Sequence, residues 1–468
     1  MVNKLCNKIS KKHVFFLITL LIHLPKTTPA QTLNLYDAVI STITNYPLLK
    51  QRGAEIKTAK AHEQTIKGNK LPSLILQNQL DMGTVNSLPG TYFPLGIIPS
   101  VSGGNSVTNK NQLNAGDIAI SYLQWEFYNF GYVKAQQKEA IANTELNNAL
   151  LDKDTYLLTL NIVAQYLDWQ KKYNLLHIEI NNLSRAKLIY TSIRAHVLSG
   201  LKAGVDTSTA KAAYSGARLS YLKALDDYNT AKISLFSYTS IKNDLLLPDT
   251  ISINKLLLNE LALINQKDSI SSFHPLLNVY QKKVEMELAY NKVLSKKYLP
   301  HFDFTGAAFI RGTGISPTGN YSTDMNMPYS RYNYLMGLTI SYNIFDLKHR
   351  NDQLLEGKYE VDALQEELKT QTISLNTMLQ QTASSYNITL EKLTEIPIQQ
   401  QAATDAYNQQ LALYRSGLNT IIDITNAQYI LMQAETNYAI AQNELIMLLF
   451  IRAGLNGQSD NFLQKFKQ

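Results

Sequence analysis

The sequence is poor in the residues and motifs that carry catalysis or covalent stabilisation. It has one cysteine, Cys6, so no disulfide can form within a single chain. It contains no GxxxxGK[ST], HExxH or GxSxG motif, and its eight histidines are scattered rather than grouped. These absences predict a protein that is not an enzyme, has no metal or other cofactor, and is held together by packing or assembly alone.

Long apolar runs are also missing after the first 30 residues. No stretch of 18 or more apolar residues occurs there, which excludes ordinary transmembrane helices. Any membrane contact of the exported chain must therefore come from another kind of structure.

Residues 1–30 have the composition of a secretory signal peptide; a buried N-terminal helix is the alternative. Four lysines precede the apolar run from Val14 to Leu24, and Thr28-Pro29-Ala30 follows as a small-residue cleavage site. Cys6 lies before this run, where it is badly placed for lipid attachment. Removing the segment takes five lysines and no acid, so the net charge falls from +7 to 39 − 37 = +2. The chain is predicted to be exported, and its high pI gives no support for nucleic-acid binding.

The rest of the chain contains two copies of one pattern. Residues 47–72 run from Pro-Leu-Leu to Leu-Pro, and residues 275–300 do the same, at an offset of 275 − 47 = 228. Ser-Gly-Leu at 199–201 precedes Asp206, and Ser-Gly-Leu at 416–418 precedes Asp423, at an offset of 423 − 206 = 217. Two such matches in the same order indicate a tandem duplication.

The duplication predicts five segments along the chain. They are a signal peptide over 1–30, a first repeat over 31–240, a connector over 241–268, a second repeat over 269–455 and a C-terminal tail over 456–468. Each repeat is expected to read helix, strand, strand, helix.

Periodicity and breakers set the expected elements of both copies. The first copy predicts a helix over 33–70 broken near 45–47, a strand over 73–82, a loop over 84–115, a strand over 117–128 with a bulge near Tyr122-Leu123, a helix over 132–198, a turn over 200–204 and a helix over 206–238. The second predicts a helix over 275–298, a strand over 301–312, a loop over 313–331, a strand over 332–345, a helix over 348–415, a turn over 416–420 and a helix over 422–453. At 1.5 Å per residue each longest helix spans roughly 100 Å, and Pro397 should kink or break the second.

The strand over 332–345 has two chemically different faces. Its apolar face carries Tyr332, Tyr334, Met336, Leu338, Ile340, Tyr342 and Ile344. Its opposite face is mostly polar, with Leu335 as the exception. Tyrosines at both ends of an apolar face are typical of a membrane β-barrel that faces lipid outward, whereas a strand pair of a soluble sandwich is the alternative.

Four strands cannot close a barrel, and open strand edges are not tolerated in a bilayer, so several chains must pool their strands. Three chains would supply twelve. The predicted fold is therefore mainly α with a membrane β-barrel. The long helices form a tube of helical hairpins, and the strands of several chains share one β-barrel.

This plan resembles the TolC family of outer-membrane efflux proteins. The matching residues are Asn45-Tyr46-Pro47-Leu48-Leu49 with Leu71-Pro72, His274-Pro275-Leu276-Leu277 with Leu299-Pro300, Phe345-Asp346, and the Gly-Leu turns before Asp206 and Asp423. The resemblance implies a homotrimer in the bacterial outer membrane, in contact with its lipid. Its long-helix hairpins would form a trimeric α-barrel that extends into the periplasm, and each chain would give four strands to a shared 12-stranded β-barrel. It also implies docking on a periplasmic adaptor, or membrane fusion protein, that serves an inner-membrane pump.

The candidate pore residues follow the two turns. Six carboxylates from Asp206 and Asp423 of a trimer would form a charged constriction. The resemblance places Asp423 on the first of the family's constricting aspartates. The second falls on Asn426, and a gate arginine falls on Asn419. The alternative is that both aspartates are helix N-caps. A further set, Gly200, Leu201, Gly417 and Leu418, forms the candidate tip turns for adaptor docking.

The predicted function is a passive outer-membrane exit duct of a tripartite efflux or secretion system. The alternatives are a periplasmic coiled-coil adaptor, a protein-secretion duct of the same fold, and a diffusion porin. The strands count against the adaptor, and the abundance of helix counts against the porin.

Overall fold

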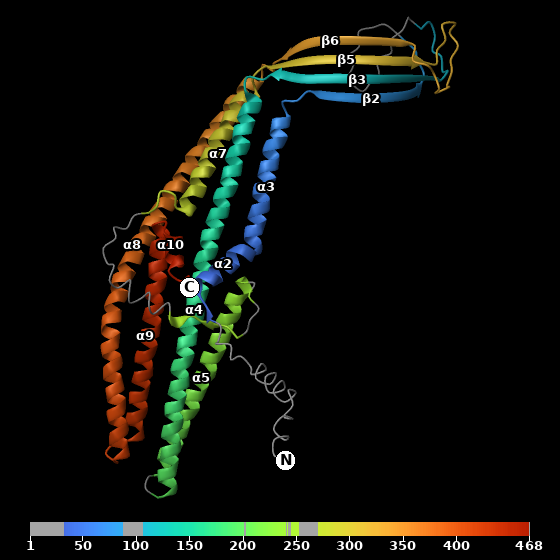
Figure 1. The fold of residues 1–468 in the computed structure, drawn as a ribbon. Helices are drawn as coiled ribbons and strands as arrows, with labels where there is room; N and C mark the ends of the chain where they lie inside the picture. The colour runs from blue at the N-terminus through green and yellow to red at the C-terminus, as the bar shows by residue number, and fades with distance from the viewer. Residues whose placement is uncertain are drawn as a thin grey trace, which may run out of the picture. The chain divides into compact units, whose positions relative to one another are not determined.

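The computed structural model describes residues 32–87, 106–200, 203–239, 241, 245–251 and 270–467 (Figure 1). The predicted signal peptide, Cys6, Leu201 and most of the connector lie outside these residues. The chain divides into two compact units, each of which combines parts of both repeats. The hairpin unit holds Met1–Lys50, Asp154–His274 and Ile373–Gln468, and the sheet unit holds Gln51–Lys153 and Pro275–Thr372.

The helices agree closely with the sequence pattern. They are α2 (Leu35–Asn45), α3 (Pro47–Gly68), α4 (Tyr132–Leu198), α5 (Gly204–Tyr238), α7 (Pro275–Lys297), α8 (Asp346–Arg415), α9 (Ile421–Leu455) and α10 (Ser459–Gln464). The predicted break near 45–47 is confirmed: Tyr46 is extended, because the following Pro47 disfavours the helical region for it. Of the kink or local break predicted at Pro397, the break is wrong, since α8 continues as one helix of 70 residues through the proline.

Among the described residues one helix, α9, is long and apolar enough by length and composition to cross a membrane. Within its most apolar window of 18 residues, 44% is buried inside the protein. Buried core helices pass the same test, and α9 packs its apolar residues against other helices of the hairpin unit.

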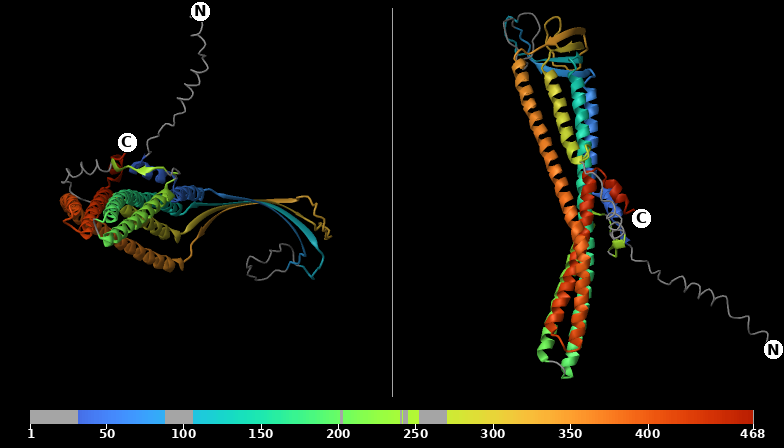
Figure 2. Two further views of the ribbon diagram at one scale, coloured as in Figure 1. Left: turned by 90° about the horizontal axis from the view of Figure 1, so that it is seen from below. Right: turned by 90° about the vertical axis from the view of Figure 1, so that its left-hand side faces the viewer.

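The sheet unit contains a four-stranded antiparallel sheet in the order β2-β3-β5-β6 (Figures 1 and 2). Its strands are β2 (Ser73–Gly83), β3 (Asn114–Tyr128), β5 (His301–Thr313) and β6 (Arg331–Ser341). β3 and β5 lie at the centre and join the two repeats. β2 and β6 lie at the two edges, and each pairs with one strand within the described chain.

Register confirms the predicted faces. Leu76 pairs with Ser121, Ser121 with Ala308, and Ala308 with Tyr334, so these side chains share one face of the sheet. The large apolar residues of β2 and β6 on that face are exposed, and Leu338 is 73% accessible. We call this the apolar face. It has no partner among the described residues of the chain.

Two details of the strands differ from the sequence prediction. The register is regular at Tyr122-Leu123, because Tyr122 belongs to the opposite face and Leu123 to the apolar face. The bulge instead lies between Glu126 and Tyr128, where β3 turns toward α4. β6 ends at Ser341, so the expected extension to 345 is also wrong: Asn343 accepts from the Phe345 N–H and starts the turn into α8.

In the hairpin unit, the side chain of Tyr166 joins helix α4 to two short strands. Two short parallel strands, β1 (Thr32–Leu33) and β4 (Leu247–Pro248), pair beside α4. The Tyr166 hydroxyl donates to the Leu33 carbonyl at 2.7 Å and accepts from the Asp249 N–H at 3.1 Å. Burial raises the pKa of Tyr166, so this hydroxyl keeps its proton throughout the physiological range. The predicted tail also packs, because the ring of Phe462 contacts the rings of both Phe450 and Phe466 in tilted arrangements.

The apolar face yields a test with an adjacent control. Because the sequence predicts that this face contacts lipid, Leu338→Arg should destabilise the membrane-folded protein by about 2–4 kcal/mol if it lies near the bilayer centre. Thr339→Arg, on the opposite face of the same strand, should cost much less. The midpoint of urea unfolding from phospholipid vesicles measures both, and equal losses would contradict the assignment of the faces.

Candidate pore constriction and the tips of the hairpins

Both predicted tip turns begin with a glycine in a left-handed conformation. Gly200 follows α4 with φ +73°, and Gly417 follows α8 with φ +78°. The Gly417 N–H donates to Tyr414 O at 3.0 Å, and the Leu418 N–H donates to Leu413 O at 2.9 Å. This pair of bonds is a Schellman motif, which satisfies the last carbonyls of α8. Leu418 itself is 75% exposed.

Asp423 lies in the first turn of α9 and makes a capping box with Thr420. The Thr420 hydroxyl and backbone N–H both donate to Asp423 Oδ2, at 2.6 and 3.0 Å. These two bonds lower the pKa of the Asp423 carboxyl, the hydroxyl being the larger cause. Thr420 is the N-cap and Asp423 is the third helical residue. The N-cap alternative is thus wrong in its position, although the carboxylate does stabilise the start of the helix.

Asp206 occupies the corresponding place in α5 but has different partners. The N-cap is Ala203, which has no side-chain cap, so the N-cap alternative fails for Asp206 as well. Asp206 acts instead on Tyr414, near the end of α8. Burial, and then the negative charge of Asp206, raise the pKa of the Tyr414 hydroxyl. The start of α5 in the first repeat is thereby close to the end of α8 in the second.

The two asparagines of the candidate set lie near Asp423. Asn419 precedes the capping box and donates to the Gln410 side chain of α8. Asn426 lies one turn after Asp423 and is exposed. Among the described residues no hydrogen bond or ion pair joins Asp206 to Asp423. The structure of one chain therefore brings Asp423, Asn419 and Asn426 together and places Asp206 within electrostatic range of Tyr414.

The tips of the two hairpins share a hydrophobic core. Residues of α4, α5, α8 and α9 form a single buried cluster, which includes Ile193, Ala210, Tyr414 and Ile424. Ile193 and Ile424 are fully buried. The two helix-turn-helix ends therefore pack as one four-helix body, so neither hairpin can move without disturbing the other.

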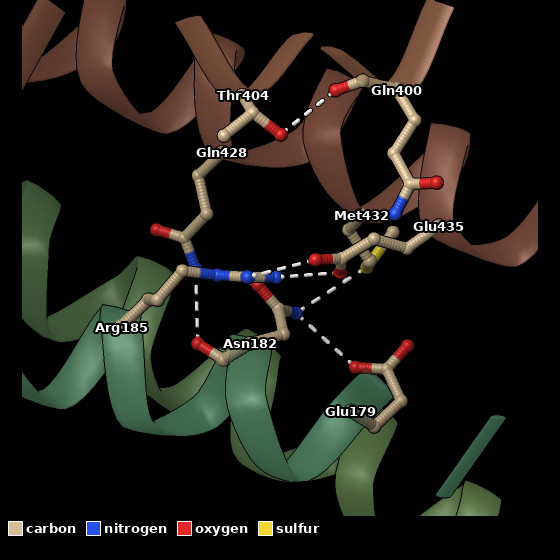
Figure 3. A network of polar contacts seen from close by, with 8 residues as sticks. All are labelled: Glu179, Asn182, Arg185, Gln400, Thr404, Gln428, Met432 and Glu435. Atoms are coloured by element: carbon tan, nitrogen blue, oxygen red, sulfur yellow. Dashed lines mark hydrogen bonds and ion pairs between the residues drawn. The ribbon is translucent and has the colours of Figure 1, made fainter. Parts of the chain in front are cut away.

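Next to this core, polar side chains of α4 and α9 form a network that joins the two repeats and that the sequence did not reveal (Figure 3). Arg185 of α4 makes two bonds to Glu435 of α9, at 3.1 and 2.9 Å. Gln428 of α9 donates to the side chain and to the carbonyl of Asn182, at 2.6 and 3.0 Å. The available signal was weak, because Gln428 is one of six amide residues along α9 and nothing in the sequence distinguishes it from the others.

The comparisons with known proteins come from sequence and from structure. The family model described as outer membrane efflux protein matches residues 97–240 and 272–447. No curated protein matches the sequence.

Several solved structures share the fold. The outer-membrane channel OprN is 18% identical with a TM-score of 0.68, covering 91% of this chain and 90% of its own. The CmeC outer-membrane channel of Campylobacter jejuni is 14% identical with a TM-score of 0.72, covering 93% and 89%. The outer-membrane protein VceC of Vibrio cholerae is 14% identical with a TM-score of 0.67, covering 90% and 96%.

The network generates a prediction about the coupling between the repeats. Arg185 and Glu435 are each only 19% exposed, and the pair is bidentate. A double-mutant cycle of Arg185→Gln and Glu435→Gln should therefore give a coupling energy of about 1.5–3 kcal/mol. The measurement is the thermal unfolding of the four proteins of the cycle.

The matched control is another pair that ends on α9. Lys392 and Glu444 are 3.2 Å apart but are 48% and 39% exposed. The double-mutant cycle of this control pair should give a coupling energy of about 0.2–1 kcal/mol. A coupling for Arg185 and Glu435 no larger than that of the control would mean that the network does not hold the repeats together.

Proposed function

Since the chain belongs to the outer membrane efflux protein family, we propose that three copies form an outer-membrane duct through which substrates leave the cell. The family resemblance and the fold inferred from sequence are confirmed by the match over both repeats. The protein is an outer-membrane channel component with a periplasmic extension. The assembly, the gate residues and the partners are the parts that we propose.

The observation that carries the proposal is the sheet with two open edges and an exposed apolar face. β2 and β6 each present a row of backbone groups that pair with no strand of the described chain. In a bilayer each unpaired backbone group costs several kcal/mol, so these edges must pair with other copies. Three copies would close a barrel of twelve strands, with the β6 edge of one copy against the β2 edge of the next.

The tips of the helical hairpins are the best place for a constriction. Asp423 carries a carboxylate whose lowered pKa keeps it charged, and Asp206 lies in the first turn of the other return helix. Three copies would bring six carboxylates to one end of the duct. Asn426 and Asn419 add polar groups where the family pattern would have charges, so the constriction is less charged than in that pattern.

The exposed turns fit a docking role for a partner in the periplasm. Leu418 projects from the turn after Gly417, with most of its side chain accessible. Gly200 begins the equivalent turn of the first repeat. In that turn we propose that Leu201 corresponds to Leu418. We infer that these turns contact a periplasmic adaptor, which links the duct to an inner-membrane pump. The duct itself performs no chemistry, and the pump supplies the energy.

The proposal predicts the conductance of planar bilayers that contain the purified protein. Wild-type channels should show small, cation-selective currents, because carboxylates narrow the pore. Asp423→Asn and Asp206→Asn should each raise the conductance and lower the cation selectivity, and the double variant should do so most.

The matched control is Asp405→Asn, an exposed aspartate in the body of α8. It should leave both quantities unchanged. A working channel whose conductance is the same in wild type and double variant would place the constriction elsewhere. Correctly inserted protein with no channel activity would overturn the duct itself.

A further inference from the structure

The four places where helices of the sheet unit meet the sheet are rich in basic residues. Because the strands are antiparallel neighbours, these junctions lie at one end of the sheet (Figure 1). Within residues 67–70, 129–138, 292–300 and 342–350 the basic residues are Lys67, Lys70, Lys134, Lys138, Lys292, Lys296, Lys297, Lys348 and Arg350. The same segments hold one acid, Asp346. We call this set the basic collar. Its ratio of nine to one contrasts with 44 to 37 in the whole chain.

Helix electrostatics explain only part of the collar. Lysines in the last turns of α3 and α7, such as Lys67 and Lys297, complement the negative ends of those helices. Lys134 and Lys348 lie instead in the first turns of α4 and α8, where the helix dipole disfavours a cation. The first turn of α4 contains no acid at all. A basic residue at that end is better explained by an anion outside the chain.

Internal partners neutralise little of this charge. Lys348 pairs with Asp352 at 3.1 Å, but both side chains are more than 60% exposed. Arg350 donates to the Ser295 carbonyl at 3.3 Å and makes no ion pair with any other described residue. Among the described residues, Lys134 and Lys138 make no ion pair. Other acids near the junctions are Asp303, which lies opposite Glu126 in the sheet, Glu126 itself, which pairs with His301, and the half-buried Glu139.

Aromatic residues mark the same end of the sheet. Trp125 shares the apolar face with Phe304 and Leu338, and its side chain is 42% exposed. Its indole N–H donates to the Lys70 carbonyl at 3.1 Å, which fixes the ring beside the collar. Tyr128 and Phe302 stack edge to face nearby. Aromatic rings at the rim of an apolar face are typical of the boundary between lipid tails and headgroups.

We propose that the basic collar binds anionic phospholipid headgroups of the bilayer leaflet on the helical side of the sheet. The inference rests on the proposed function, because it requires the sheet to span the outer membrane. The aromatic rim sets the depth of the membrane boundary. The collar then lies at the level of the phosphates, where each lysine attracts anionic lipid. The ligand is thus a phospholipid with a net negative headgroup, in preference to a zwitterionic one.

The natural fluorescence of Trp125 provides the measurement. The chain has two tryptophans, and Trp169 is fully buried, so bromine atoms on lipid tails should quench Trp125 selectively. The full-length protein is reconstituted in vesicles that mix phosphatidylglycerol and phosphatidylcholine, with bromine on one lipid or on the other. Brominated phosphatidylglycerol should quench wild-type protein more strongly at equal mole fraction, and added salt should reduce the difference.

Two triple variants that remove the same number of charges distinguish the effect of the basic collar from the effect of the protein's total charge. Lys134→Gln, Lys138→Gln and Lys297→Gln together should lower the preference for the anionic lipid by roughly a hundredfold, at roughly fivefold for each lysine. Lys57→Gln, Lys60→Gln and Lys358→Gln remove the same charge from exposed positions elsewhere on α3 and α8 and should leave the preference unchanged.

Three outcomes would overturn the proposal: equal quenching by both lipids in wild type, no loss in the collar variant, or equal loss in the control. Conductance of the same vesicles keeps the two proposals apart. Protein that inserts and conducts but shows no lipid preference contradicts the collar alone. Protein that fails to insert contradicts the duct.

Discussion

The unpaired backbone of two edge strands is the constraint on which the rest of this structure depends. A four-stranded sheet with an exposed apolar face is stable neither in water, where the face aggregates, nor in lipid, where the edges are unsatisfied. In the proposed trimer, pairing between copies would remove both problems at once. The chain would then gain a membrane-spanning wall without a long apolar segment.

Duplication gives the helices a matching role. Each repeat ends in a long hairpin, and the two hairpins pack at their tips around Ile193 and Ile424. The pair of Arg185 with Glu435 then joins α4 of the first repeat to α9 of the second by directed bonds. Apolar packing accounts for the stability of this body, and the polar network fixes which helices face each other.

Much of the fold could be predicted from the sequence because its determinants are local. Pro47, Pro72, Pro275 and Pro300 delimit helices, and an alternation broken only at Leu335 marks β6 as a strand with one apolar face. Predictions that needed three-dimensional context did less well. The bulge lies near Phe127 and not at Tyr122, because the slip in alternation reflected an aromatic residue on the opposite face. Asp206 and Asp423 proved to be the third residues of their helices. Only the structure shows that Thr420 is the N-cap of the helix that contains Asp423, and that the charge of Asp206 acts on Tyr414.

Cross-linking between the edge strands tests the shared barrel most directly. The only cysteine, Cys6, lies in the predicted signal peptide, so the exported chain provides a background without thiols. One cysteine at Leu76 of β2 is combined in turn with one at Met336, Leu338 or Ile340 of β6, and each double variant is oxidised in membranes. The account predicts that at least one pair gives covalent trimers, and that each single variant gives none. Monomers throughout the series, or covalent species that stop at dimers or extend without limit, would contradict a closed barrel of three chains.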